Sequence, residues 1–171
     1  MPQLERLHRD HAPALLRFER RNRAYFAASV PDRGDDYFAH FDDRLGELLA
    51  EQEAGLHFFH VLVDEHGEVQ GRVNLIDVAN GSAELGYRIA EAAAGRGLAT
   101  AAVREVCALA AAQYGLGALR AVTTLDNAGS RTVLARAGFR PTGEEFELDG
   151  RPGLRLAADL GSSRTTVGVQ E

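Results

Sequence analysis

Two glycines flank an arginine directly before an alanine-rich run in residues 91–104, EAAAGRGLATAAVR. Glycine permits tight turns and close approaches of the main chain that other residues resist. The alanine-rich run favours a helix from about Gly97, and the first turn of a helix offers unpaired N–H groups and the positive end of its dipole. Together these features predict an anion site, most often one for phosphate. Its main chain would come from Gly95, Arg96, Gly97, Leu98, Ala99 and Thr100.

Two common phosphate loops do not fit this stretch. The nucleoside-triphosphate loop requires a lysine, and the chain contains none. The dinucleotide fingerprint requires a small residue where Thr100 stands, and an acidic residue nearer to the loop than Asp126. A pyrophosphate loop of another kind, or a plain strand-to-helix turn, remains.

A second group of chemically capable residues lies in SAELGYRI, residues 82–89. Strand alternation places Glu84, Gly86 and Arg88 on one face, and Tyr87 and Ile89 on the other, where their side chains are expected in the core. A carboxylate beside a glycine gap could accept a proton through water. Alternatively, Glu84 is a solvent-facing residue paired with an arginine.

A third group begins a short predicted helix at residues 127–136. Asn127 is a favoured helix N-cap, which is a structural interpretation. Ser130, three residues later, carries a hydroxyl that could donate a proton. Capping and catalysis do not exclude each other.

The elements that must position these residues follow from periodicity. Apolar residues at helical spacing predict helices over 10–29, 34–54 and 97–114. Strands are predicted on both sides of the turn at 64–67, then at 82–89 and 119–125. A last hairpin is predicted with strands 146–148 and 154–156. This order predicts an α+β (mixed α/β) domain with a mixed sheet and helices on both faces. It would span residues 1–160, before a polar tail, 161–171, expected to be disordered.

Composition narrows the functional classes. A net charge of −6 over 171 residues argues against general nucleic-acid binding. Cys107 is the single cysteine and the six histidines are scattered, so neither an intrachain disulfide nor a metal site is expected. The N-terminus shows no signal peptide or membrane span, so a cytoplasmic location is expected.

Three stretches together resemble the GNAT superfamily of N-acetyltransferases. They are ELGYRI at 84–89, AGRGLAT at 94–100 and DNAGSRTVLARAGF at 126–139. The family loop has Gln or Arg, two residues, Gly, one residue, then Gly or Ala; Gly97 and Ala99 match, whereas Ala94 departs from Gln or Arg. Asn127-x-x-Ser130 is most similar to the branch of ribosomal-protein-alanine N-acetyltransferases. The resemblance covers about residues 5–160.

The resemblance implies a fold, a co-substrate and a binding mode. The fold would be a mixed, mostly antiparallel sheet of six to seven strands flanked by about four helices. Acetyl-CoA would be the co-substrate, with its pyrophosphate on residues 95–100. The main chain of Tyr87, Arg88 and Ile89 would pair with the pantetheine arm and polarise the thioester carbonyl. Asn127 would bind the pantetheine amide or a water.

The resemblance also implies catalytic roles. Glu84 would be the base, unless water alone suffices. Ser130 would protonate the thiolate, because Leu134 occupies the position of a tyrosine acid in many GNAT enzymes. The N-terminal helices would form the acceptor wall, with an acidic rim of Asp32, Asp35, Asp36, Asp42, Asp43 and Glu47.

The acceptor remains open at this point. It could be a protein N-terminus, such as an N-terminal alanine, or a small molecule such as an amino acid, a polyamine or an antibiotic. A non-catalytic acyl-CoA sensor on the same fold is the alternative to an enzyme, and a homodimer is also left open.

Overall fold

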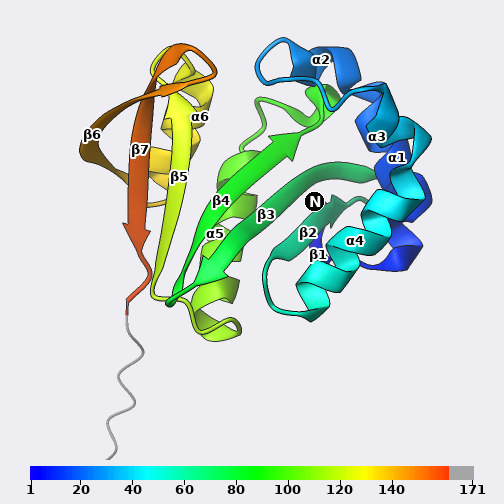
Figure 1. Cartoon of the computed structure of the whole chain (residues 1–171), viewed down its shortest axis with the longest axis horizontal. Coiled ribbons are helices and arrows are strands. Elements are labelled where there is room, and N and C mark those ends of the chain that lie inside the picture. Colours follow the sequence, from blue (N-terminus) through cyan, green and yellow to red (C-terminus); the bar gives the residue numbers. More distant parts are fainter. Residues whose placement is uncertain (162–171) are drawn as a thin grey trace, which may run out of the picture.

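A computed structural model describes residues 1–161, and a seven-stranded sheet forms its centre in the order β1-β2-β3-β4-β5-β7-β6 (Figure 1). Neighbouring strands are antiparallel except β4 and β5, which run parallel. This is the mixed, mostly antiparallel sheet that the sequence predicts. The strands are β1 (Gln3–Arg6), β2 (Phe58–Val63), β3 (Val69–Ala79), β4 (Ser82–Ile89), β5 (Ala118–Thr124), β6 (Arg140–Leu148) and β7 (Arg151–Asp159).

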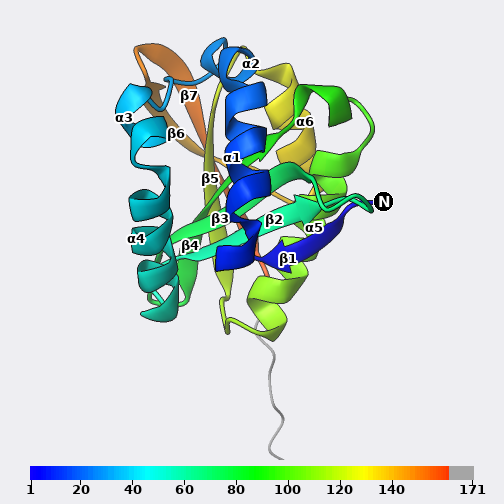
Figure 2. The ribbon, with the colours of Figure 1, turned by 90° about the vertical axis from the view of Figure 1, so that its right-hand side faces the viewer.

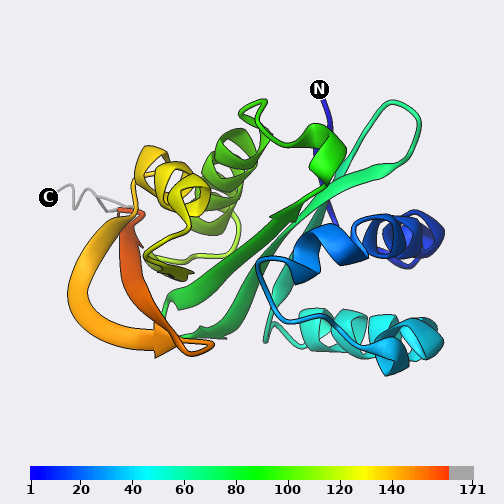
Figure 3. The same ribbon diagram turned by 90° about the horizontal axis from the view of Figure 1, so that it is seen from above.

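Helices cover both faces of the sheet (Figures 2 and 3). One face carries α1 (Ala12–Arg21), α2 (Arg23–Ala27), α3 (Asp35–Ala39) and α4 (Phe41–Glu53). The other carries α5 (Leu98–Ala112) and α6 (Ala128–Arg136). Two 3₁₀ turns, η1 (Arg9–His11) and η2 (Glu91–Ala93), join these elements. Within residues 1–161, no helix combines the length and apolar character needed to cross a membrane.

The sheet forks between its two parallel strands. β4 and β5 pair only over Ser82–Glu84 and Ala118–Arg120. Beyond that point β5 continues to pair with β7 as far as Thr124, whereas β4 runs on to Ile89 beside β3. The edge of β4 that faces β5 therefore has no strand partner from Leu85 onward within the described chain, and Figure 1 shows the two strands diverging.

Alternation along β3 and β4 separates an apolar face from a polar one. Val73 and Leu75 of β3 are fully buried, as is the paired Leu85 of β4, and α5 packs against both strands. The opposite face, toward α1, presents Arg72 and Asn74 of β3 beside Arg88 and Gly86 of β4. The predicted division of β4 into two faces is confirmed.

Both predicted N-terminal helices are interrupted. The first, predicted over 10–29, breaks at Asn22 between α1 and α2. Its side-chain amide donates to the carbonyl of Phe18 at 2.9 Å, in the way that asparagine competes with helical hydrogen bonds. The second, predicted over 34–54, breaks at His40, whose φ and ψ of −118° and 32° are not helical. Periodicity detects the buried stripe of both segments but not these local breaks.

Two strand features differ from the prediction. β1 was not predicted, because QLER shows no apolar alternation; pairing with β2 creates the strand. The last hairpin is longer than predicted and turns through Asp149 and Gly150, both at positive φ. Such a two-residue turn matches the twist of antiparallel strands. The predicted polar tail lies outside the described residues from position 162 onward.

Candidate functional site

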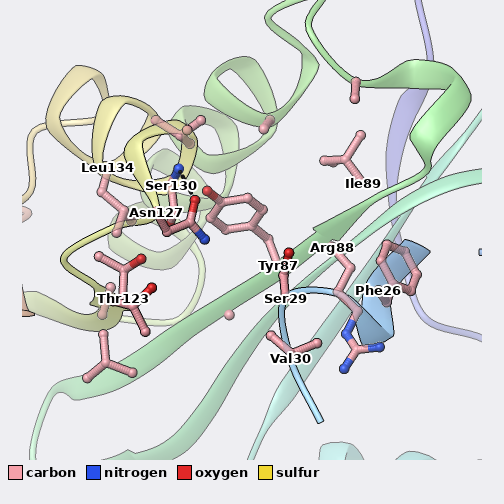
Figure 4. Close-up of a pocket in the computed structure, with 18 of the residues that line it drawn as sticks. Phe26, Ser29, Val30, Tyr87, Arg88, Ile89, Thr123, Asn127, Ser130 and Leu134 are labelled. Carbon is pink, nitrogen blue, oxygen red and sulfur yellow. Dashed lines mark hydrogen bonds between the residues drawn. The ribbon is translucent and has the colours of Figure 1, made fainter. Parts of the chain in front are cut away.

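The fork between β4 and β5 opens into a cavity of about 1140 Å³ (Figure 4). Its walls come from β4, β5, the α2–α3 connection and the N-termini of α5 and α6. Every residue predicted for the site lines this cavity except Arg96. Those that do are Glu84, Tyr87, Arg88, Ile89, Gly95, Gly97, Leu98, Ala99, Thr100, Asn127 and Ser130.

The glycine loop forms one end of the cavity. Gly95 and Gly97 both have φ of 75°, a conformation that other residues adopt only with strain. Gly97 is the N-cap of α5 and provides no side-chain cap, so the N–H groups of the first turn, from Leu98 onward, have no intrahelical acceptor. A Cβ added at either glycine would meet no atom within 4 Å. The loop therefore presents open space and N–H donors to an anion, and fits a pyrophosphate.

Asn127 caps α6. Its Oδ1 accepts a hydrogen bond from the Ser130 main-chain N–H at 3.0 Å. This confirms the structural interpretation of Asn127. The cap uses only the oxygen, so the side-chain NH₂ of Asn127 can still donate to a ligand in the cavity.

Tyr87 contributes more than the predicted main chain. Its ring projects into the cavity, and its hydroxyl lies beside Ser130 (Figure 4). Burial raises the pKa of Tyr87, although a hydrogen bond with the Ser130 side chain opposes this rise. The phenol therefore stays protonated at neutral pH. Alternation had placed this side chain on the core face of β4, whereas the structure brings its ring into the cavity; only the position of α6 brings its hydroxyl to Ser130.

Leu134 of α6 is fully buried in the core, in agreement with its lack of a proton to donate. The hydroxyls of Tyr87 and Ser130 lie together in the cavity, whose lining also includes Ser29 and Thr123. The structure thus places a proton donor from β4 near the one expected from α6.

Glu84 lies where the pairing of β4 with β5 ends. It forms no ion pair within residues 1–161, so the predicted alternative, a Glu84 paired with Arg88 or another arginine, is wrong; Arg88 approaches Glu19 instead. A Cβ at the neighbouring Gly86 would meet nothing within 4 Å. The carboxylate and the glycine gap therefore both open to the cavity, as the sequence predicted.

A buried ionic cluster lies on the face of β4 toward α1, and it was not predicted from the sequence. Glu19 of α1 is 1% exposed and receives hydrogen bonds from Arg72 at 2.8 Å and Arg33 at 2.9 Å. Arg88 approaches the same carboxylate at 3.8 Å. Tyr37 completes the group, with its hydroxyl 3.4 Å from Arg72 and its ring under Arg33. We refer to these five residues as the Glu19 cluster.

The Glu19 cluster fixes the charge of its members. Burial alone would raise the pKa of Glu19, but the Arg72 and Arg33 guanidiniums outweigh it and hold the pKa below its usual value. Glu19 is therefore ionised at neutral pH. The one sequence signal was Arg72, a lone cation within an apolar strand, which required a buried partner that sequence alone could not identify.

The predicted acidic rim is partly neutralised. Arg23 binds both Asp32 and Asp35 at 2.8 Å. Glu47 pairs with Arg44 at 2.7 Å. The Arg23 pairs tie α2 to the α2–α3 connection and to the start of α3, whereas the Glu47 pair lies within α4; both weaken the rim as an attractor of cations.

The Asn22 side chain connects α1 and α2 to the segment that precedes the glycine loop. It is 4% exposed, and its Oδ1 accepts from the main-chain N–H of Glu91, in η2, at 3.0 Å. Because η2 follows β4 and precedes the glycine loop, this bond fixes the loop segment against α1 and α2.

The sequence profile of the acetyltransferase (GNAT) domain matches residues 3–140. The chain belongs to this family. It is therefore an acetyl-CoA-dependent N-acetyltransferase, as the three motifs indicated. No protein with a curated description matches the chain in sequence.

Solved structures of the GNAT type have the same fold. A ribosomal-protein-S5-alanine acetyltransferase from Vibrio fischeri superposes with a TM-score of 0.86 at 21% identity, over 92% of both chains. RimJ from Mycobacterium smegmatis, solved with CoA-disulfide, gives 0.80 at 26% identity, over 91% of this chain and 80% of that one. A spermidine N-acetyltransferase from Vibrio cholerae, solved with CoA and spermine, gives 0.72 at 21% identity, over 92% and 95%.

Proposed function

We propose that this enzyme transfers the acetyl group of acetyl-CoA to a primary amine by direct attack in a ternary complex, with a protein N-terminal alanine as the leading acceptor. The observation that carries the proposal is one cavity lined by the glycine loop, the free edge of β4, the hydroxyls of Tyr87 and Ser130, and the Glu84 carboxylate. These groups meet every chemical demand of amide formation from a thioester.

Coenzyme binding falls mainly to the main chain. The N–H groups of residues 95–100 take the pyrophosphate at the start of α5. The pantetheine arm pairs with the free edge of β4 as an added strand, with Asn127 as a further donor. An N–H of Tyr87, Arg88 or Ile89 then donates to the thioester oxygen and stabilises the charge that develops there.

Proton transfer falls to side chains. An α-amino group has a pKa of about 7.7 to 8.0, so Glu84 acting through water is a sufficient base. The amine loses a proton to Glu84 through water and its nitrogen forms the new C–N bond. The C–S bond breaks, the thiolate takes a proton from Ser130, and water returns a proton to Ser130. The Tyr87 hydroxyl lies beside Ser130 in the cavity.

Attack by Cys107 on the thioester is disfavoured. The thiol does not line the cavity, and burial raises its pKa to about 11. It therefore carries almost no thiolate at neutral pH, and only the thiolate is an effective nucleophile.

Two other functions have some support. The structural likeness to a spermidine acetyltransferase is compatible with a small-molecule acceptor. An acyl-CoA sensor would use the same loop without turnover, but it would not need the unpaired carboxylate and two hydroxyls in the cavity.

A screen of acceptors with mass-spectrometric detection of acetylated products tests the proposal. It pools peptides with different N-terminal residues, amino acids, polyamines and aminoglycosides. We expect peptides with N-terminal alanine to be acetylated. CoA binding without any turnover would instead identify a sensor, and preferred acetylation of polyamines or drugs would identify a small-molecule enzyme.

Ser130→Ala tests the assigned acid. We expect kcat to fall about 100-fold, the lower range for loss of a general acid or base, with the dissociation constant of CoA unchanged. Ser82→Ala is a matched control, because Ser82 lies outside the cavity and its hydroxyl accepts only from Arg120. An equal loss of turnover and CoA affinity would show that Ser130 is structural.

A further inference from the structure

Arg88 differs from the other arginines of the Glu19 cluster. Arg72 and Arg33 both donate hydrogen bonds to Glu19, whereas Arg88 makes only the 3.8 Å approach and no hydrogen bond within residues 1–161. Its side chain is 24% exposed, rests on the ring of Phe26 and lines the cavity. A half-buried guanidinium with five N–H donors and no acceptor is an incomplete site.

The surroundings of Arg88 favour an anion. Three guanidiniums approach one carboxylate in the Glu19 cluster, and no other carboxylate lies within 4 Å of them in the described chain. With three guanidiniums and one carboxylate, the cluster carries two surplus positive charges. Burial lowers the pKa of Arg88, and repulsion by Arg33 lowers it further. An anion at Arg88 would relieve this repulsion.

The position of Arg88 relates it to the reacting amine. Glu84, Gly86 and Arg88 share one face of β4, so about 13 Å of strand separates the first from the last. The glycine gap lies midway between the carboxylate and the guanidinium. An amine that reaches the thioester over Gly86 would therefore have a negative group on one side and a positive group on the other.

We propose that the Arg88 side chain binds a carboxylate of the acceptor, so that the preferred acceptor is an amine that also carries an acidic group. The inference rests on the proposed acetyl transfer to an amine and narrows its acceptor. The carboxylate can belong to a free amino acid or to an acidic residue near a peptide N-terminus. Polyamines are disfavoured, because their additional ammonium groups would face the surplus positive charge of the Glu19 cluster.

Paired acceptors test this proposal. One pair is alanine and alaninamide; the other is the amidated peptides Ala-Glu-Ala-Ala and Ala-Gln-Ala-Ala; spermidine is the cationic comparison. We expect the acidic member of at least one pair to have a KM about 10- to 100-fold lower, the range for a hydrogen bond to a charged group. The pair that responds identifies the source of the carboxylate.

Variants then assign the effect to Arg88. Arg88→Gln should remove the preference by raising KM for the acidic acceptor, and Arg88→Lys should restore part of it. Arg120→Gln is the matched control, since Arg120 lies on the adjacent strand outside the cavity and should retain the preference. Unchanged CoA affinity in Arg88→Gln shows that the variant is folded.

The outcomes separate this proposal from acetyl transfer itself. Equal rates with acidic and neutral acceptors, a preference for spermidine, or an intact preference in Arg88→Gln would each overturn the role of Arg88 while acetyl transfer stands. If no amine is acetylated, the acetyl-transfer proposal fails, and calorimetry with N-acetyl-Ala-Glu on the CoA-loaded protein decides the role of Arg88. Tighter binding to wild type than to Arg88→Gln supports the role, and equal binding overturns it.

Discussion

The two faces of β4 are lined by different kinds of chemical groups. On the side that faces α5 and α6, the cavity offers main-chain N–H groups, a glycine loop and hydroxyls. On the side that faces α1, it is backed by the buried ionic Glu19 cluster. In the proposed mechanism, coenzyme binding depends mainly on backbone geometry, whereas acceptor binding depends on ionised side chains.

The variant with the largest expected effect on this contrast is Glu19→Gln. Loss of the carboxylate leaves the three guanidiniums of the Glu19 cluster without a counter-charge, and their side chains are only 4%, 24% and 26% exposed. Breaking a buried ion pair costs about 3–5 kcal/mol, so we expect a loss of that size in the free energy of unfolding, measured with urea.

Glu68→Gln is the control for that measurement. Glu68 also pairs with an arginine, Arg17, at 2.9 Å, but this pair is exposed. We expect its removal to cost about 0–1 kcal/mol. Similar losses in both variants would mean that the Glu19 cluster has no special role in stability.

The second test is the pH dependence of the free energy of unfolding, to which His60 and Glu19 contribute in different pH ranges. His60 of β2 is buried against Tyr114, and burial lowers its pKa from 6.5 to about 4. The unfolded chain takes up this proton from about pH 6.5 downward, whereas the folded protein resists until about pH 4. The contribution of His60 to the free energy of unfolding is therefore complete above pH 6.5, and about 3 kcal/mol of it is lost as the pH falls to 4.

Glu19 adds a separate loss at lower pH. Its lowered pKa stabilises the fold above the usual value of 4.5, and this contribution is lost as the pH falls through the folded pKa. Urea titrations between pH 3 and 8 should therefore show two phases. His60→Gln should remove the upper phase alone. Glu19→Gln should reduce the lower phase without removing it, because Asp32 and Asp64 also have lowered pKa values and contribute there. Loss of both phases in either variant would contradict the assignment.

The test with the smallest expected effect concerns the glycine loop. Gly97→Ala forces a side chain into a left-handed conformation, at a cost of about 1–2 kcal/mol in stability. It should also weaken CoA binding about tenfold or more, because a pyrophosphate held by N–H groups leaves little space for a Cβ. Calorimetric titration with CoA measures this loss.

Gly115→Ala is the matched control for the loop. Gly115 follows α5 with φ of 66° and has similar open space, but it does not line the cavity. It should show the same strain with unchanged CoA affinity. Equal affinities for both variants would remove the main-chain loop from coenzyme binding.

The same contrast explains what the sequence could predict. The glycine loop, the N-cap at Asn127 and the two faces of β4 are local patterns, so spacing alone located them. The Glu19 cluster joins α1, the α2–α3 connection, α3, β3 and β4 across long separations. Arg72 alone stands out in the sequence, as a cation within an apolar strand, and its partners cannot be identified from spacing. The hydroxyl of Tyr87 was missed for the same reason, since only packing of α6 brings Ser130 to it.

The buried amide of Asn22 has a thermodynamic consequence. Its hydrogen bond with the Glu91 main-chain N–H joins α1 and α2 to the segment that leads into the glycine loop. If binding of one ligand orders this junction, the protein loses the corresponding conformational entropy at that step. The second ligand then binds to an already ordered protein and loses less entropy. By linkage, the acceptor must then strengthen the hold on the coenzyme by the same factor that the coenzyme strengthens the hold on the acceptor.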